Sequence, residues 1–181
     1  WPGKFRTAED VSILQRMVGD DAAWCREYLL KIISDADRVV HPEWIHYYDG
    51  EAPGAEDQRY QMTGVGIDLA IAQTETADFT AMVFARIVDG KMYVLPNPIN
   101  ERLTFPDTID RVKAVYHSFG ARERRYIYVE KVGYQEAVIQ QLARDGLHVE
   151  GVNPGSQDKR SRLALTTAHI KAGYILFPRT G

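Results

Sequence analysis

Two acidic residues stand at the ends of apolar segments, where a solvated surface residue is not expected. Asp68 lies inside the run Gly64–Ala72, whose other members are apolar residues or glycine. Glu130 ends the short β-rich segment Tyr126–Glu130. A buried carboxylate is costly unless it is paired, hydrogen-bonded or bound to a metal. These two positions are therefore the first candidates for chemistry.

If the two segments are neighbouring strands, both carboxylates lie at the edge of the sheet where α/β proteins gather their ligands. Two converging carboxylates suit hard divalent cations such as Mg²⁺, which prefer oxygen ligands and retain waters. Pairs of these ions drive in-line phosphodiester cleavage, because one generates hydroxide and the other stabilises the leaving oxygen. The residues alone leave a second interpretation open, in which Asp68 is a turn or cap acid and Glu130 caps the following helix.

The segments around the acids predict a mixed sheet covered by helices. Apolar runs and turn signals give the element order β-β-β-α-β-α-β-α-β, a meander followed by β-α-β units. Asp89-Gly90 is a hairpin turn signal between the second and third strands. The expected strands are 62–72, 81–88, 91–95, 126–129, 148–152 and 174–177, and the expected helices are 106–119, 133–145 and a last helix from 156 or 158 to 171.

The front of the chain has a different character. Helical spacing predicts two helices there, one after Thr7 and one through Trp24, Tyr28 and Ile32. Residues 49–58 hold two glycines, one proline and four acids, which is typical of an exposed linker. We therefore expect a helical linker region over residues 1–61 and an α/β domain over 62–181.

The composition is that of an ordinary soluble globular chain. Its 181 residues are 45% hydrophobic and carry a net charge of −3. A single cysteine, Cys25, excludes an intramolecular disulfide framework. No apolar run approaches the roughly 20 residues that span a bilayer, so we expect a cytosolic protein with no membrane partner. Charge alone does not support nucleic-acid binding, and any basic face must be local.

Around the two acids the sequence resembles the nuclease domain of phage terminase large subunits. The matching motifs are, in chain order, Gly66-Ile-Asp68-Leu-Ala, Thr76-Ala-Asp78-Phe-Thr80, Tyr93-Val-Leu95, Tyr128-Val-Glu130, Asp158-Lys159-Arg160-Ser-Arg162 and Gly173-Tyr-Ile-Leu-Phe-Pro178. The front segment is similar to the stretch that joins the ATPase motor to the nuclease, through Trp1-Pro-Gly-Lys-Phe5, Glu27-Tyr-Leu29 and His41-Pro-Glu-Trp-Ile45.

This resemblance implies an α/β fold of the ribonuclease H-like type and a DNA endonuclease that cuts concatemeric duplex DNA during viral packaging. It implies two Mg²⁺ or Mn²⁺ ions, with Asp68 as the first-strand acid between them and Glu130 as the second acid. The third acid of the family follows the strand that ends here in Phe177-Pro178. We therefore expect the chain to stop before that acid and to cleave weakly or not at all. The absence of an initiator methionine before Trp1 is expected to mark a piece of a longer protein.

Four further residues follow from the same resemblance. Asp78 matches a recurrent acid of the family and is a second-tier metal ligand, with a turn-stabilising role as the alternative. Lys159 matches a basic position near the scissile phosphate. Arg160 and Arg162 open the same helix, where free N–H groups and the helix dipole favour phosphate, or they form a solvated basic turn.

The resemblance also implies partners. They are duplex DNA, the ATPase domain of the same full-length chain, the portal and the small terminase subunit, in the host cytoplasm of a phage or prophage. No Gly-x-x-x-x-Gly-Lys-Ser/Thr motif occurs in the 181 residues, so no ATP hydrolysis is expected from them.

Two other functions stay open. The first is a non-catalytic module that docks the motor to DNA or portal, for which the acidic front of the chain allows a protein partner. The second is another ribonuclease H-like nuclease of the resolvase or transposase type, against which the front segment speaks.

Overall fold

The computed structural model describes residues 8–18, 24, 38–70, 79–131, 135–155 and 158–179. The chain forms two compact units, residues 1–41 and residues 42–181. In the first unit, α1 (Ala8–Val18) is an amphipathic helix, and Trp24 is a buried residue. None of the helices in these ranges is long and apolar enough to cross a membrane.

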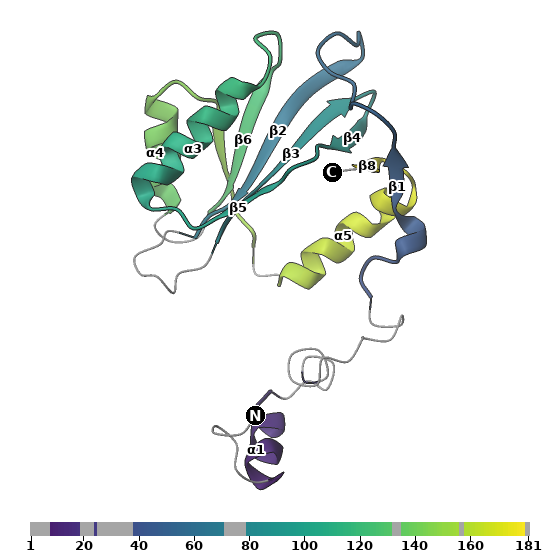
Figure 1. Cartoon of the computed structure of the whole chain (residues 1–181), viewed down its shortest axis with the longest axis vertical. Coiled ribbons are helices and arrows are strands. Elements are labelled where there is room, and N and C mark those ends of the chain that lie inside the picture. The colour runs from purple at the N-terminus through teal and green to yellow at the C-terminus, as the bar shows by residue number, and fades with distance from the viewer. Residues whose placement is uncertain are drawn as a thin grey trace. The chain divides into compact units, whose positions relative to one another are not determined.

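The second unit is built on one mixed sheet of eight strands (Figure 1). The order is β1-β8-β4-β3-β2-β6-β7, with β5 beside β3. The pairs β2/β6, β6/β7, β4/β8 and β1/β8 are parallel, and β3 is antiparallel to β2, β4 and β5. The strands are β1 (His46–Tyr48), β2 (Tyr60–Asp68), β3 (Thr80–Val88), β4 (Lys91–Val94), β5 (Ile99–Glu101), β6 (Arg125–Glu130), β7 (Val149–Val152) and β8 (Ile175–Pro178).

In the described part of this unit, three α-helices and one short 3₁₀ turn accompany the sheet. They are η2 (Pro42–Trp44), α3 (Phe105–Ser118), α4 (Gln135–Arg144) and α5 (Lys159–Lys171). In Figure 1, α3 and α4 lie side by side near β6, whereas α5 lies near β1 and β8. The predicted mixed sheet flanked by helices is confirmed.

Local sequence signals explain the main turns and helix ends. Asp89 and Gly90 both adopt positive φ, which is the geometry of the tight hairpin that the Asp-Gly pair predicted between β3 and β4. Thr104 caps α3, where its hydroxyl accepts a hydrogen bond from the Asp107 backbone N–H, and Pro106 occupies the first turn. Asp158 caps α5 in the same way.

The core lies between one face of the sheet and the helices α3 and α4. Alternate strand residues point to that face, as the two-residue period of a strand requires. Helical residues spaced three or four apart meet them. The fully or almost fully buried members are Val65, Ile67, Met82, Ile127 and Val129 from the strands, and Ile109, Val112, Val138 and Leu142 from the helices.

The division of the chain differs from the boundary predicted between residues 61 and 62. Residues 42–61 belong to the larger unit, because β1 pairs with β8 at the edge of the sheet. The Tyr48 hydroxyl donates a hydrogen bond of 2.8 Å to the Val94 carbonyl, and Ala52 and Gly54 are buried within the stretch predicted to be an exposed linker. These long-range contacts cannot be inferred from the composition of residues 49–58. Most of the second predicted front helix lies outside the described residues.

Candidate functional site

The two acids singled out by the sequence end adjacent parallel strands. Asp68 is the last residue of β2 and Glu130 is the last residue of β6. Ile67 and Val129, the residues directly before them, are paired across the two strands. The acids therefore leave the sheet at the same edge and in the same register, as the ligand-gathering edge of an α/β sheet requires. The Asp68 side chain is 49% exposed and that of Glu130 is 22% exposed.

A groove of about 340 Å³ opens beside the acids. Its floor includes Gly66, which is exposed and has no atom within 3.9 Å of the position that a Cβ would take. Tyr128 and Val152 line the wall on the neighbouring strands, and Arg162 approaches from α5. The absence of a side chain at Gly66 keeps the approach to both carboxylates open.

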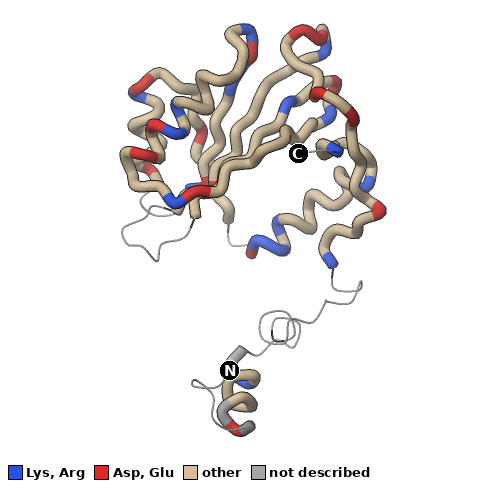
Figure 2. The backbone as a smooth tube through the Cα atoms, viewed as in Figure 1, with Lys and Arg blue, Asp and Glu red and all other residues tan. Residues whose placement is uncertain are grey.

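The first turn of α5 brings two basic residues onto the acids. The Lys159 ammonium lies 2.8 Å from an Asp68 carboxylate oxygen, and the Arg162 guanidinium lies 3.1 Å from a Glu130 oxygen. Lys159 and Arg162 are three residues apart, which places them on one face of the helix. In Figure 2 the first turn of α5 is coloured mainly blue. Two negative and two positive side chains thus meet at one point.

The two nearby carboxylates change the pKa of Lys159. The hydrogen bond that Lys159 donates to Asp68, the negative charge of Asp68 and the charge of Glu130 raise the pKa of Lys159 above its usual value of 10.5. Lys159 is consequently a full cation at neutral pH.

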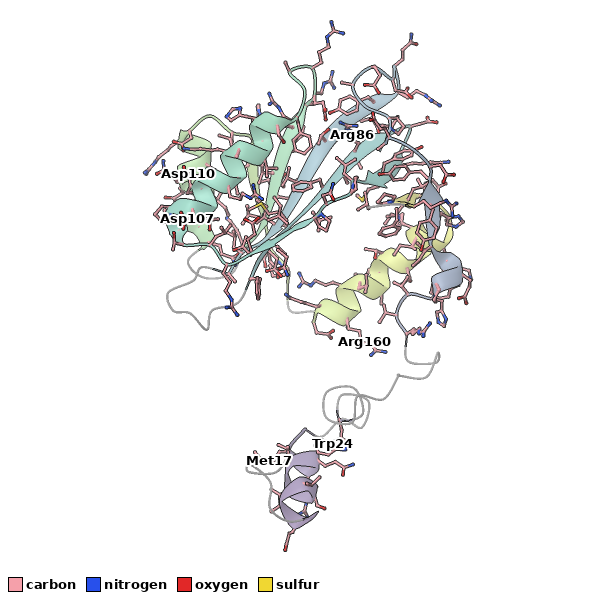
Figure 3. All side chains as sticks on the ribbon, viewed as in Figure 1. Met17, Trp24, Arg86, Asp107, Asp110 and Arg160 are labelled. Atoms are coloured by element: carbon pink, nitrogen blue, oxygen red, sulfur yellow. The ribbon has the colours of Figure 1, made fainter. Side chains whose placement is uncertain are left out.

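The remaining predicted site residues are placed differently. Arg160 lies in the same turn of α5 with an exposed side chain that extends away from the strands (Figure 3). Asp78 lies outside the described residues. It precedes β3, whose residue Ala81 is the antiparallel partner of Asp68.

Two polar residues that the sequence did not single out fix the chain just after Asp68. The Gln135 side chain is buried and donates a hydrogen bond of 3.0 Å to the Leu69 carbonyl. The Thr80 hydroxyl donates to the Ala70 carbonyl at 2.9 Å and accepts from the Ala70 N–H at 3.2 Å. These contacts hold the backbone that carries Asp68. No local pattern around Gln135 or Thr80 predicts them, because their partners lie far away in sequence.

The donor set fits a hard cation in part. Each of the two carboxylates contacts a cationic side chain, so this edge of the sheet stabilises positive charge. Carboxylate oxygens are also the ligands that Mg²⁺ and Mn²⁺ prefer. Within the described residues, no group of three or more histidine, cysteine, aspartate or glutamate side chains could hold a metal. Among the described residues, the carboxylates of Asp68 and Glu130 are the two placed at this edge where they could bind such an ion.

A larger cavity, of about 470 Å³, shares no lining residue with this groove. Arg86 lines it, but the charge of Arg86 is neutralised by Glu123 at 3.0 Å, and a further donor binds the Ala52 carbonyl at 3.0 Å. The walls are mainly apolar, from residues such as Phe84, Leu95 and Phe119. That cavity has no pair of acids, and the candidate site remains the edge at Asp68 and Glu130.

The strand order and the paired acidic strand ends define a ribonuclease H-like domain. The family of terminase RNaseH-like domains matches residues 65–180, and the chain belongs to this family. The resemblance noted in the sequence is thereby confirmed. A comparison with curated proteins found no match.

Solved structures agree on the fold. The large terminase nuclease of thermophilic phage G20c with bound magnesium superimposes with a TM-score of 0.54 at 15% identity, over 75% of this chain and 70% of that chain. The zinc-bound form of the same nuclease gives 0.53 at 15% identity, over 75% and 77%. The large terminase of another thermophilic bacteriophage gives 0.56 at 12% identity, and the match covers 96% of this chain but 42% of that one.

Proposed function

We propose that this chain carries the nuclease of a terminase large subunit and cuts concatemeric duplex DNA during viral DNA packaging, by metal-dependent phosphodiester hydrolysis. The observation that carries the proposal is the position of Asp68 and Glu130 at the ends of two adjacent parallel strands. Membership of the terminase RNaseH-like family and the magnesium-bound structure of the G20c nuclease support it.

In this proposal Asp68 and Glu130 hold Mg²⁺ or Mn²⁺, with two ions as the expected number. Such ions, when bound, activate a water molecule and stabilise the leaving oxygen of the phosphodiester. Asp78 is proposed as an additional ligand, because it precedes the strand that pairs with the end of β2. Gln135 and Thr80 keep the backbone after Asp68 in place, so that the carboxylate does not have to be ordered when the substrate arrives.

The basic residues of α5 are proposed to bind the DNA backbone. Lys159, Arg160 and Arg162 lie in the first turn of the helix, and two of them contact the acids directly. Phosphate contacts fix the register of the duplex without reading its sequence. The proposed enzyme therefore cuts with little base recognition.

The front of the chain is proposed to connect the nuclease to the packaging ATPase in the host cytoplasm, with the portal and the small terminase subunit as further partners. Residues 42–61 are part of the larger compact unit. The proposed connection therefore runs through residues 1–41 rather than through the whole of 1–61.

Plasmid nicking tests the proposal. The 181-residue protein and its variants Asp68→Asn and Glu130→Gln are incubated with supercoiled plasmid and Mg²⁺ or Mn²⁺, next to the control Asp110→Asn, which removes the same charge from an exposed position on α3. We expect at most weak nicking by the 181-residue protein, because the third acid of the family is expected to lie beyond it, and any nicking should need the metal and be lost in both site variants. Equal nicking by the parent protein and Asp68→Asn would remove Asp68 from the mechanism. Absence of metal binding in calorimetry, with an intact fold, would favour the non-catalytic docking module.

A further inference from the structure

We infer that Lys159 and Arg162 compete with the divalent cation for Asp68 and Glu130, and change partner from carboxylate to DNA phosphate when the metal binds. The inference rests on the proposed function. It starts from the two ion pairs, which neutralise both acids with the side chains of a single helical turn. A divalent ion bound to those carboxylates repels an ammonium or guanidinium at the same oxygens, so the two kinds of cation exclude each other.

The first turn of α5 is weakly attached to the rest of the unit. The buried residue of the described helix is Ile170, close to its C-terminal end. Leu163 and Leu165, in the N-terminal half, are 44% and 67% exposed. With so little apolar contact, the ion pairs of Lys159 and Arg162 help to hold this half of the helix against the strand ends. Metal binding removes both ion pairs together.

The Arg162 side chain has a hydrogen-bond donor that lacks an acceptor. Its Nε is buried and has no hydrogen-bond partner among the described residues, although the guanidinium contacts Glu130. A buried donor without an acceptor is unfavourable. A phosphate offers more acceptor oxygens than the single carboxylate oxygen that Arg162 now contacts, and planar guanidinium groups bind phosphate through two parallel hydrogen bonds. The change of partner therefore also gives Arg162 a better set of acceptors.

This device has a functional consequence. Without metal, the acids and bases neutralise each other, and the proposed site offers little net charge to DNA. With metal, the same lysine and arginine become available beside the metal-bound carboxylates, at the place where the scissile phosphate has to lie. Metal and DNA binding are then coupled, and each increases the affinity for the other.

Calorimetric titration of the 181-residue protein with MnCl₂ tests the competition. We expect Lys159→Gln to bind Mn²⁺ roughly two- to fivefold more tightly than the parent protein, as the loss of an exposed ion pair allows. Arg162→Gln should bind up to about tenfold more tightly, because its pair with Glu130 is less exposed. The control Lys171→Gln removes the same charge from the other end of α5, where the ammonium lies over the Trp44 ring, and should leave the affinity within about 1.5-fold.

The outcomes separate the inference from the proposed function. If neither the parent protein nor any variant binds Mn²⁺, or if binding is unchanged in Asp68→Asn, the proposed metal site is wrong and the inference falls with it. If binding depends on Asp68 but is unchanged or weaker in Lys159→Gln and Arg162→Gln, the proposed function stands and the competition is wrong. Amide hydrogen exchange gives an independent readout, since exchange in residues 159–165 should become faster on adding Mn²⁺. Unchanged or slower exchange there contradicts release of the turn.

Discussion

Asp68 and Glu130 stand in the same register on β2 and β6, yet their ion pairs differ in exposure. The pair of Asp68 with Lys159 joins side chains that are 49% and 75% exposed. The pair of Glu130 with Arg162 joins side chains that are 22% and 30% exposed. Water screens the first pair far more than the second. The two acids are therefore equivalent in geometry but not in their effect on the metal-free fold.

Glu130→Gln should destabilise the metal-free protein more than Asp68→Asn does. Loss of the Glu130 charge leaves a half-buried guanidinium without its counter-ion, and we expect the free energy of unfolding to fall by about 1–2 kcal/mol. Loss of the exposed pair at Asp68 should cost less than about 1 kcal/mol. Urea unfolding in the presence of a chelator measures both. An equal loss in the two variants would show that the difference in exposure has no energetic effect.

The sequence predicted those parts of the structure that depend on neighbouring residues. A carboxylate in an apolar run revealed Asp68, Asp-Gly revealed the hairpin after β3, and Pro106 revealed the start of α3. In each case the signal lies within a few residues of the feature. The catalytic role of Asp68 and Glu130 remains a proposal. Their convergence was expected only on the condition that the two strands are neighbours, and the pairing of β2 with β6 meets that condition.

Contacts between distant segments could not be predicted in this way. Lys159 meets Asp68 across 91 residues, and Gln135 meets the Leu69 carbonyl across 66. The strand β1 has three residues and pairs with the edge that β8 offers, 125 or more residues away in sequence. β5 follows Asn-Pro, which is typical of a loop, and forms because it pairs with β3. Tertiary pairing decides these elements, and no local propensity specifies it.

A buried ion pair outside the site should be the most sensitive electrostatic contact of the fold. Glu123 is 7% exposed, accepts from Arg86 at 3.0 Å and also receives a hydrogen bond from the Thr63 hydroxyl. Glu123→Ala leaves the 22% exposed Arg86 side chain without its counter-ion, and we expect a loss of about 3–5 kcal/mol in the free energy of unfolding.

The matched control for this prediction is Glu101→Ala, whose pair with Arg111 joins side chains that are 42% and 39% exposed. That variant should lose less than about 1 kcal/mol. Glu123→Gln keeps an acceptor and should fall between the two. A loss below about 1 kcal/mol in Glu123→Ala would show that Arg86 is neutralised by another group.

The cap of α5 should give a pH-dependent contribution to stability. Hydrogen bonds from the backbone N–H and the hydroxyl of Ser161 lower the pKa of Asp158 below its usual value of 3.8. The folded state thus favours the charged form, and its contribution is complete above the unfolded pKa and is lost as the pH falls through the folded one. Asp158→Asn keeps the cap without the charge.

Urea unfolding of the parent protein and Asp158→Asn, at several pH values between about 6 and 3, checks this. We expect the parent protein to be the more stable near neutral pH, and the difference to shrink once the pH falls below 3.8. Acids common to both proteins cancel in that difference. A difference that does not change with pH would show that the carboxylate charge has no role in the cap.

Replacement by alanine should affect the stability of the fold differently at two glycines. At Gly66 an added Cβ meets nothing closer than the Val83 carbonyl oxygen at 3.9 Å, so Gly66→Ala should change the free energy of unfolding by less than about 0.5 kcal/mol. At Gly151 it would stand 2.9 Å from Cδ1 of the buried Ile139, so Gly151→Ala should lose about 1–3 kcal/mol. The methyl group at Gly66 enters the groove beside the acids and should lower plasmid nicking up to roughly tenfold. Unchanged nicking would show that DNA does not use this groove.

The larger compact unit should fold without the first 41 residues but not without the segment that follows them. A chain of residues 42–181 keeps β1, the hydrogen bond from Tyr48 to the Val94 carbonyl and the bond from Arg86 to the Ala52 carbonyl. A chain of residues 58–181 keeps all of β2 but loses each of these contacts and exposes the edge of β8. We expect the first to melt within a few degrees of the 181-residue protein and the second at least roughly 10 °C lower.

Tyr48→Phe in the chain of residues 42–181 separates the hydrogen bond from the burial of the ring. The phenol ring packs edge-on against Tyr93 and is 9% exposed, so the variant loses the hydroxyl alone and should lose about 1 kcal/mol in the free energy of unfolding. Equal melting temperatures for the chains beginning at residues 42 and 58 would show that β1 follows the sheet without stabilising it. Residues 58–181 alone would then account for the stability of the larger unit, as the composition of residues 49–58 suggested. The parallel pairing of β1 with β8 would be a consequence of the fold and would not contribute to its stability.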